Sequence, residues 1–402
     1  MPMKKNTGST LQGITRLVSH ATIEATNVVE AMHHQVVHPP FLPSTPIQHL
    51  ITNIASFTYQ GIRLGTRVIG RSLDKILEKL APFLGEIKAT NDREAVLSVL
   101  NGVVGDYLEK EENPLQLKMQ FRCQGKSLSI ARKSIEKTYP NYNGKILLLV
   151  HGSCMNDLQW TRAEHNHGLQ LGQDLGKTPI YLQYNSGRHI SENGQDLNGL
   201  LEKLVSEWPA PVEELTVLAH SMGGLVTRSA LYYGQQQQKS WTKQLKKIVF
   251  LGTPHHGAPL ERIGNYVDVI MGGIPYAKPF ARLAKIRSAG VTDLRYGNLI
   301  RSDWEGKERF KIQKDSRQAI PLPKQVECYS IAAVFGKTST GKTGQMLGDT
   351  LVNVKSALGK HKDPAKSLNF KEDHTWISYE TSHLDLLSNI KVYTKIKAWL
   401  EI

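Results

Sequence analysis

The sequence predicts an α/β protein built on a mostly parallel, doubly wound sheet, with a helical extension before it. Two observations carry this prediction. Short apolar runs alternate with helical stretches from about residue 117 onward, and before residue 113 apolar residues recur every three or four positions. Alternating strands and helices are typical of a parallel sheet covered on both faces. With 402 residues, 40% of them hydrophobic, the chain can bury a large core without disulfide bonds.

The first part of the chain is expected to be helical. Apolar residues form one stripe over residues 11–32, four prolines interrupt residues 39–46, and helical patterns follow at 47–84 and 93–108. We therefore expect a helical N-terminal extension over residues 1–113. Its basic and apolar residues fit peripheral contact with a membrane, docking on the same protein or contact with another copy.

The second part, residues 114–402, carries the predicted sheet. A hairpin is expected around Gly125, between residues 118–122 and 128–132. The apolar runs are short and rich in Ile, Leu and Val, as in buried parallel strands. The expected strands are 145–150, 179–184, 214–219, 246–251 and 326–334, and the expected helices are 162–175, 191–208, 222–233 and, at the C-terminus, 384–400.

Charge and cysteine content indicate the kind of partner and the compartment. The formal charge of +14 could favour anionic surfaces, but no nucleic-acid motif accompanies it, so nucleic acid is not an expected partner. The three cysteines are odd in number and widely spaced, which fits a reducing compartment. With neither a secretory signal nor a run of 18 apolar residues, we expect a cytoplasmic protein.

A serine at a strand-to-helix turn is the first sign of chemistry. The predicted strand 214–219 runs into the segment 219–224, AHSMGG, and a helix follows. Small neighbours are needed where a nucleophilic serine occupies a sharp turn between strand and helix. Ser221 is therefore the candidate nucleophile, with Ala219 in a position that more often holds glycine.

A second strand end supplies candidate oxyanion donors. The predicted strand 145–150 ends in His151-Gly152, where backbone N–H groups can point into a site. Acyl transfer needs two such donors for the tetrahedral oxyanion. We assign them to the N–H groups of Met222 and Ser153, with Cys154 as the alternative to Ser153, and expect His151 to support the loop.

The acid and base should follow the serine in the chain, in that order. Asp349 lies beyond the predicted strand 326–334, whereas the rivals Asp293, Asp303 and Asp315 precede it. His374 and His383 flank the apolar stretch 375–379. If this stretch is the last strand, only His383 lies at its carboxyl end, where ligands gather. Asp349 and His383 are therefore the expected acid and base, and His374 is expected to be structural.

These motifs, in this order, resemble an α/β-hydrolase of the lipase/esterase group that includes the GPI inositol-deacylase-like proteins. The resemblance covers about residue 144 to the C-terminus and rests on VHG at 150–152, AHSMGG at 219–224, LGTPHHG at 251–257, GDTLV at 348–352 and SHLDLL at 382–387. It implies a serine ester hydrolase without an organic cofactor. Ala219 and Thr350 depart from the usual glycines but remove no reacting group.

Two further segments carry predictions about the surroundings of the site and about metal binding. Residues 258–323 are long for a connection between strands, and we expect a helical cap over the site, with a fixed helical decoration as the alternative. Glu30, His34 and His38 have helical spacing that could suit a metal, but no further ligand is in view, so we expect no metal.

The sequence thus predicts a serine carboxylic ester hydrolase acting through an acyl-enzyme on apolar acyl esters, with a small-molecule or lipid ester as partner. A membrane-associated phospholipase or a thioesterase would use the same side chains. A hydrolase fold that serves only as a scaffold is the non-enzymatic alternative.

Overall fold

The computed structural model describes residues 91–258, 287–307, 309, 315–336, 349 and 351–401. The chain divides into two compact units, residues 1–96 with 271–287 and residues 97–270 with 288–402, and the features below belong to the second. The helices expected before residue 91, the residues Glu30, His34 and His38, and residues 259–286, 308 and 310–314 of the expected cap lie outside the described residues. The boundary expected at 113/114 stays a prediction.

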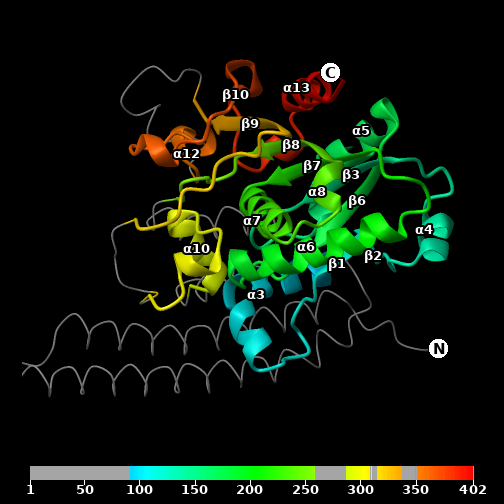
Figure 1. Cartoon of the computed structure of the whole chain (residues 1–402), viewed down its shortest axis with the longest axis horizontal. Coiled ribbons are helices and arrows are strands. Elements are labelled where there is room, and N and C mark those ends of the chain that lie inside the picture. Colours follow the sequence, from blue (N-terminus) through cyan, green and yellow to red (C-terminus); the bar gives the residue numbers. More distant parts are fainter. Residues whose placement is uncertain are drawn as a thin grey trace, which may run out of the picture. The chain divides into compact units, whose positions relative to one another are not determined.

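The sheet has eight strands in the order β10-β9-β8-β7-β3-β6-β1-β2 (Figure 1). Their bounds are β1 Gln120–Cys123, β2 Lys126–Ser127, β3 Lys145–Val150, β6 Thr178–Gln183, β7 Glu214–His220, β8 Leu245–Leu251, β9 Glu327–Val334 and β10 Thr375–Tyr379. The β1–β2 and β1–β6 pairs are antiparallel, and every other neighbouring pair is parallel. The predicted parallel strands are therefore confirmed. The hairpin around Gly125 is present, but its second strand is Lys126–Ser127 rather than 128–132, and α4 begins at Arg132.

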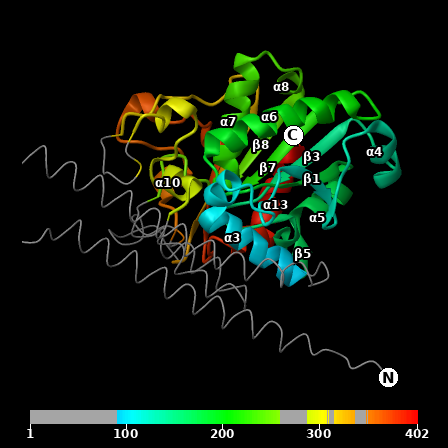
Figure 2. The same ribbon diagram turned by 90° about the horizontal axis from the view of Figure 1, so that it is seen from below.

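Helices cover both faces of the sheet. Figure 2 shows α6, α7 and α8 on one side, and α5 and α13 on the other. The helix bounds are α4 Arg132–Thr138, α5 His167–Leu175, α6 Ile190–Glu207, α7 Met222–Gln236, α8 Trp241–Gln244, α10 Ala289–Tyr296, α12 Val354–Ala357 and α13 Ile390–Glu401. Fully buried side chains of β3 and β7 pack in one core cluster with those of α6 and α7. The alternation of strands and helices along the sequence therefore produces a sheet covered by helices.

Two predicted helices are wrong at their ends. The helix expected over residues 162–175 begins only at His167, where the Asn166 side chain accepts a hydrogen bond from the Leu169 N–H. Before it, β4 (Thr161–Arg162) and β5 (His165–Asn166) form a hairpin. Towards the C-terminus, the helix expected from Leu384 is divided into a 3-10 turn at Asp385–Leu387 and α13.

The sheet has its switch point between β3 and β7. These strands are neighbours, but the chain leaves β3 for β6 on one side and leaves β7 for β8 on the other. In open α/β sheets, ligands bind at the carboxyl ends of strands where the connections diverge in this way. The His151 loop and Ser221 both follow these two strands directly.

Helix α3 (Asn91–Lys110) contributes its residues from Leu97 onward to the same unit. Val99, Leu100 and Val103 are fully buried. The Asn101 side chain donates to the Leu115 carbonyl and accepts from the Leu117 N–H, which ties the helix to the chain that leads into β1. Across the residues that the structure describes, no helix combines the length and apolar character needed to cross a bilayer.

Candidate active site

Ser221 occupies the tight turn between β7 and α7 that the sequence predicts. Its backbone angles are φ +54° and ψ −123°, a conformation that side-chain-bearing residues rarely adopt. The Ser221 N–H donates to the Leu251 carbonyl at 2.8 Å, which fixes the turn to the end of β8. A strained serine held by its surroundings at the carboxyl edge of a sheet is the arrangement expected of a nucleophile at a strand-to-helix turn.

The two glycine-bearing motifs meet at this turn. A Cβ on Gly223 would lie 2.4 Å from the Val150 oxygen, so only glycine lets the first turn of α7 approach the end of β3 so closely. A Cβ on Gly152 would lie 3.1 Å from the Ser221 Cβ. The loop after β3 therefore lies against the serine, as its proposed role as an oxyanion donor requires.

His383 and Asp349 are in direct contact. The His383 Nδ1 lies 2.6 Å from the Asp349 Oδ2. The other carboxylate oxygen of Asp349 accepts hydrogen bonds from the N–H groups of Leu351 and Val352 at 3.0 and 2.8 Å. Both side chains are buried, so the imidazole is oriented by a carboxylate that is itself fixed by backbone donors.

The His383 ring lies beside the serine turn. A Cβ on Gly252, the residue after β8, would lie 2.9 Å from the His383 Cε1, and Gly252 adopts φ +57°. Because the carbonyl of the preceding Leu251 holds the Ser221 N–H, the ring and the serine meet at the end of one strand. His220 adds a second link, since its Nε2 lies 3.1 Å from the His383 carbonyl oxygen and the two rings are 4.7 Å apart.

The loop after β3 distinguishes the two candidate oxyanion donors. The Cys154 N–H donates to the Ser186 Oγ at 2.9 Å, which favours Ser153 over the alternative Cys154. His151 supports the loop: its Nδ1 lies 2.7 Å from the Gly152 oxygen, and its ring stacks on Tyr184, whose hydroxyl donates to the His151 carbonyl.

His151 makes stability depend on pH. Burial lowers the pKa of His151 to about 4, against the opposing effect of its hydrogen bond to Gly152. A histidine of the unfolded chain binds its proton near pH 6.5. Between these values the unfolded state holds more protons, so the free energy of unfolding falls as pH decreases. We expect a slope of about 1.4 kcal/mol per pH unit from this one group.

Urea denaturation of wild type and His151→Phe at several pH values between neutral and about pH 5 measures this slope. Phenylalanine retains the stacking on Tyr184 but cannot take up a proton. The variant should show the shallower dependence of the free energy of unfolding on pH. Equal slopes would contradict the assignment of the buried neutral histidine.

We predict that His220 positions His383, a role that the sequence pattern does not indicate. Its N–H holds the carbonyl of the residue that carries the imidazole, so His220→Phe should let that loop shift. A displacement of about 1 Å at a reacting group can cost as much as 100-fold in rate. We expect kcat for an ester to fall about tenfold or more with little change in KM.

The glutamine variant, His220→Gln, keeps an N–H donor and should recover part of the rate. His374→Gln is the matched control. His374 lies just before β10, at the amino-terminal ends of the strands and so at the opposite end of the sheet from Ser221, and its Nδ1 contacts the Cys328 carbonyl. If the phenylalanine and control variants have the same kcat, His220 has no positioning role.

The rival acids are engaged elsewhere. Asp293 accepts from the Ile190 N–H and contacts His189, Asp303 accepts from the Leu299 and Ile300 N–H groups, and Asp315 pairs with Arg317. Within the described residues, therefore, the carboxylate that contacts His383 is Asp349, from the loop beyond β9.

Helix α3 lies against the same edge of the sheet. A Cβ on Gly102 would lie 2.3 Å from the Cys154 Sγ, and the Asn185 side chain donates to the Gly105 carbonyl. Ser221 and His383 are 0% exposed. Helix α3 thus covers the loops that follow β3 and β6. Its apolar pattern is the same as that of any helix packed on a core, so the sequence alone does not predict this position.

A comparison with models of protein families found a match to part of this chain. Residues 141–320 match the family model of the PGAP1-like alpha/beta domain. The comparison with curated proteins found no match.

Solved structures with similar folds include three hydrolases. The mature lipase BlEst2 of Bacillus licheniformis is 16% identical, with a TM-score of 0.40, covering 63% of this chain and 91% of its own. The esterase Pf2001 of Pyrococcus furiosus is 17% identical, with a TM-score of 0.38 and coverages of 65% and 82%. The NocB thioesterase domain is 12% identical, with a TM-score of 0.38 and coverages of 65% and 96%.

Proposed function

We propose that this chain, an α/β-hydrolase of the lipase/esterase group, hydrolyses carboxylic esters of apolar acyl groups, with Ser221 as nucleophile, His383 as base and Asp349 as orienting acid. The single observation that carries the proposal is the 2.6 Å contact between His383 and Asp349 beside the strained serine turn. A nucleophile, a base and an acid that fixes the base are the set that acyl transfer requires.

The proposed reaction begins when the Ser221 Oγ attacks the ester carbonyl and its proton moves to His383. Asp349 holds the imidazole in one tautomer and stabilises the imidazolium. The N–H groups of Met222 and Ser153 stabilise the tetrahedral oxyanion. His383 then gives the proton to the leaving alcohol, which leaves an acyl-enzyme. A water activated by His383 attacks it, and the acid is released.

The groups of the site itself support ester hydrolysis rather than a cofactor-dependent reaction. The site supplies nucleophile, base and oxyanion donors from its own side chains and backbone, and each reaction step needs only these.

The cysteines indicate the compartment. The buried cysteines Cys154 and Cys328 and the half-buried Cys123 are free thiols, which favours the cytoplasmic compartment that we propose.

Turnover of p-nitrophenyl esters across acyl chain lengths tests the proposal, together with labelling by a fluorophosphonate and peptide mapping of the labelled site. We expect turnover above the uncatalysed rate and one label, on Ser221. Preference for thioesters would indicate a thioesterase, and activity only on vesicle-bound phospholipid would indicate the membrane-associated alternative. No turnover and no label would leave the scaffold interpretation and overturn the proposal.

A further inference from the structure

A small pocket rich in cations lies apart from the serine, between α7, the loop after β8 and the segment before β9. It is lined by Arg228, His255, His256, Asp303, Arg317 and Lys366, among others, and we call it the Arg228 pocket. Its enclosed space is about 20 Å³, room for one water-sized group.

Arg228 is a buried guanidinium without a carboxylate partner. Its side chain donates to the Ile320 carbonyl at 2.7 Å and contacts the His255 Nδ1 at 3.4 Å. Within the described part of the chain, no carboxylate lies within ion-pair distance of it. Burial lowers the pKa of Arg228 to about 10, which leaves it charged at neutral pH. A buried charge without a counter-charge costs several kcal/mol.

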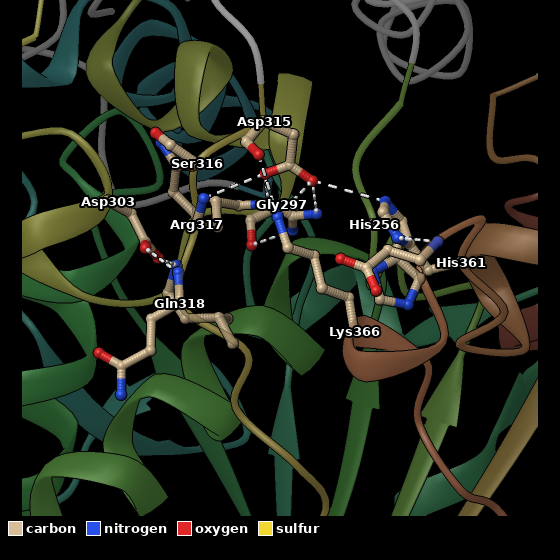
Figure 3. Close-up of polar contacts among 12 residues, drawn as sticks. His256, Gly297, Asp303, Asp315, Ser316, Arg317, Gln318, His361 and Lys366 are labelled. Atoms are coloured by element: carbon tan, nitrogen blue, oxygen red, sulfur yellow. Dashed lines mark hydrogen bonds and ion pairs between the residues drawn. The ribbon is translucent and has the colours of Figure 1, made fainter.

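The nearby carboxylates do not cancel the cations. Asp315 lies between Arg317, at 2.9 and 3.0 Å, and Lys366, at 3.2 Å, with His361 on another side (Figure 3). Asp303 is used by backbone N–H groups. The cluster therefore holds three positive charges, on Arg228, Arg317 and Lys366, against two negative ones, which leaves one positive charge.

The loop after β8 carries polar atoms with unused hydrogen-bonding capacity. Within the described residues, the buried His255 Nε2 and His256 Nδ1 have no hydrogen-bond partner in the protein. Because the His255 Nδ1 faces the Arg228 donor, the proton of the neutral ring belongs on Nε2, which makes this atom a donor. Buried donors are normally satisfied, so His255 adds a neutral donor to the cations of this pocket.

We propose that the Arg228 pocket binds a singly charged oxyanion group, one oxygen of which enters beside Arg228 and His255. Charge-assisted bonds from guanidinium and ammonium groups suit phosphate and carboxylate oxygens. Arg228 follows Ser221 by seven residues, about 10 Å along the helix and close to the same side of it. The anion is therefore either a free ion or a group carried by the ester, and the inference goes beyond the proposed hydrolysis.

Thermal unfolding with added sodium phosphate, compared with sodium chloride at equal ionic strength, tests the site in the full-length protein. The wild-type midpoint should rise with phosphate and saturate. Arg228→Met should abolish this dependence. Lys366 also lines the pocket, and Lys366→Met should weaken phosphate binding about tenfold or more. This second variant keeps the proposal testable if Arg228→Met does not fold.

Arg301→Met is the matched control, because the Arg301 side chain is 64% exposed and pairs with Glu305 on the surface, away from the residues that line the Arg228 pocket. It should respond to phosphate as the wild type does. If phosphate stabilises the wild type no more than chloride does, or if the Lys366 variant responds fully, the proposal is overturned. These readouts do not depend on catalysis, so the anion site and the hydrolase function can fail separately.

A second arm distinguishes the two sources of the anion. The kcat/KM values for a neutral short-chain triglyceride and for a singly charged phospholipid of equal chain length are measured with and without phosphate. If the ester carries the anion, phosphate competes only with the charged ester, and Lys366→Met lowers kcat/KM only for that ester. If the anion is free, phosphate affects both esters alike.

Discussion

Ser221→Ala is expected to lower kcat for ester hydrolysis by about 10⁴-fold or more. The alanine side chain cannot attack the carbonyl, while the backbone donors of Met222 and Ser153 and the substrate contacts remain, so KM should change little. The measurement is steady-state turnover of the best p-nitrophenyl ester, with fluorophosphonate labelling as a second readout. Retention of more than a few per cent of the wild-type rate would mean that another group performs the attack.

Folding controls separate this chemical loss from structural damage. Alanine keeps a Cβ at φ +54°, so its thermal stability should match that of wild type. Ser206→Ala removes a hydroxyl that contacts only the Lys203 carbonyl on the surface of α6, and it should keep full activity. Ser221→Gly should be inactive yet more stable, by about 1–3 kcal/mol, because glycine adopts this conformation without strain.

Asp349→Asn is expected to lower kcat about 10³- to 10⁴-fold. The asparagine carbonyl oxygen can still accept from the Leu351 and Val352 N–H groups, so the loop should keep its shape. The amide, however, carries no charge to stabilise a protonated His383, and its NH₂ group can hold the ring in the wrong tautomer. The loss should appear in kcat rather than in KM.

Asp363→Asn is a matched control, since Asp363 also accepts the N–H of the residue two positions later, but its side chain is exposed, whereas that of Asp349 is buried. Its kcat should equal that of wild type. If the two variants lose activity equally, or if Asp349→Asn keeps its full rate, the carboxylate is not part of the catalytic machinery.

Much of this arrangement follows from pattern alone. The run 145–150 is apolar at every interior position because β3 is buried on both faces, which is why its predicted bounds equal the observed ones. The order of serine, acid and base follows from topology: Asp349 and His383 come after β9 and β10, whose carboxyl ends meet the same edge as β7. The preference for His383 over His374 rested on that geometry.

Other features left no local signal. The β4–β5 turn places Ala163 and Glu164 at φ +47° and +60°, without the glycine or asparagine that usually marks such a turn. Its helical composition therefore predicted a helix that starts five residues too early. The predicted positioning role of His220 depends on its contact with the His383 carbonyl, which lies 163 residues later in the chain. Contacts between residues so far apart in sequence cannot be derived from the periodicity around either one.

The complete burial of Ser221 beneath neighbouring loops has a kinetic consequence. If the chain hydrolyses esters as proposed, substrate would reach the Ser221 hydroxyl only in conformations that expose it, and the measured affinity would be the intrinsic affinity scaled by the fraction of molecules in such conformations. A surface that preferentially binds these conformations would raise that fraction and accelerate turnover without touching a reacting group. For the proposed hydrolase, the rate of the chemical step and the fraction of molecules open to substrate would thus be separate properties.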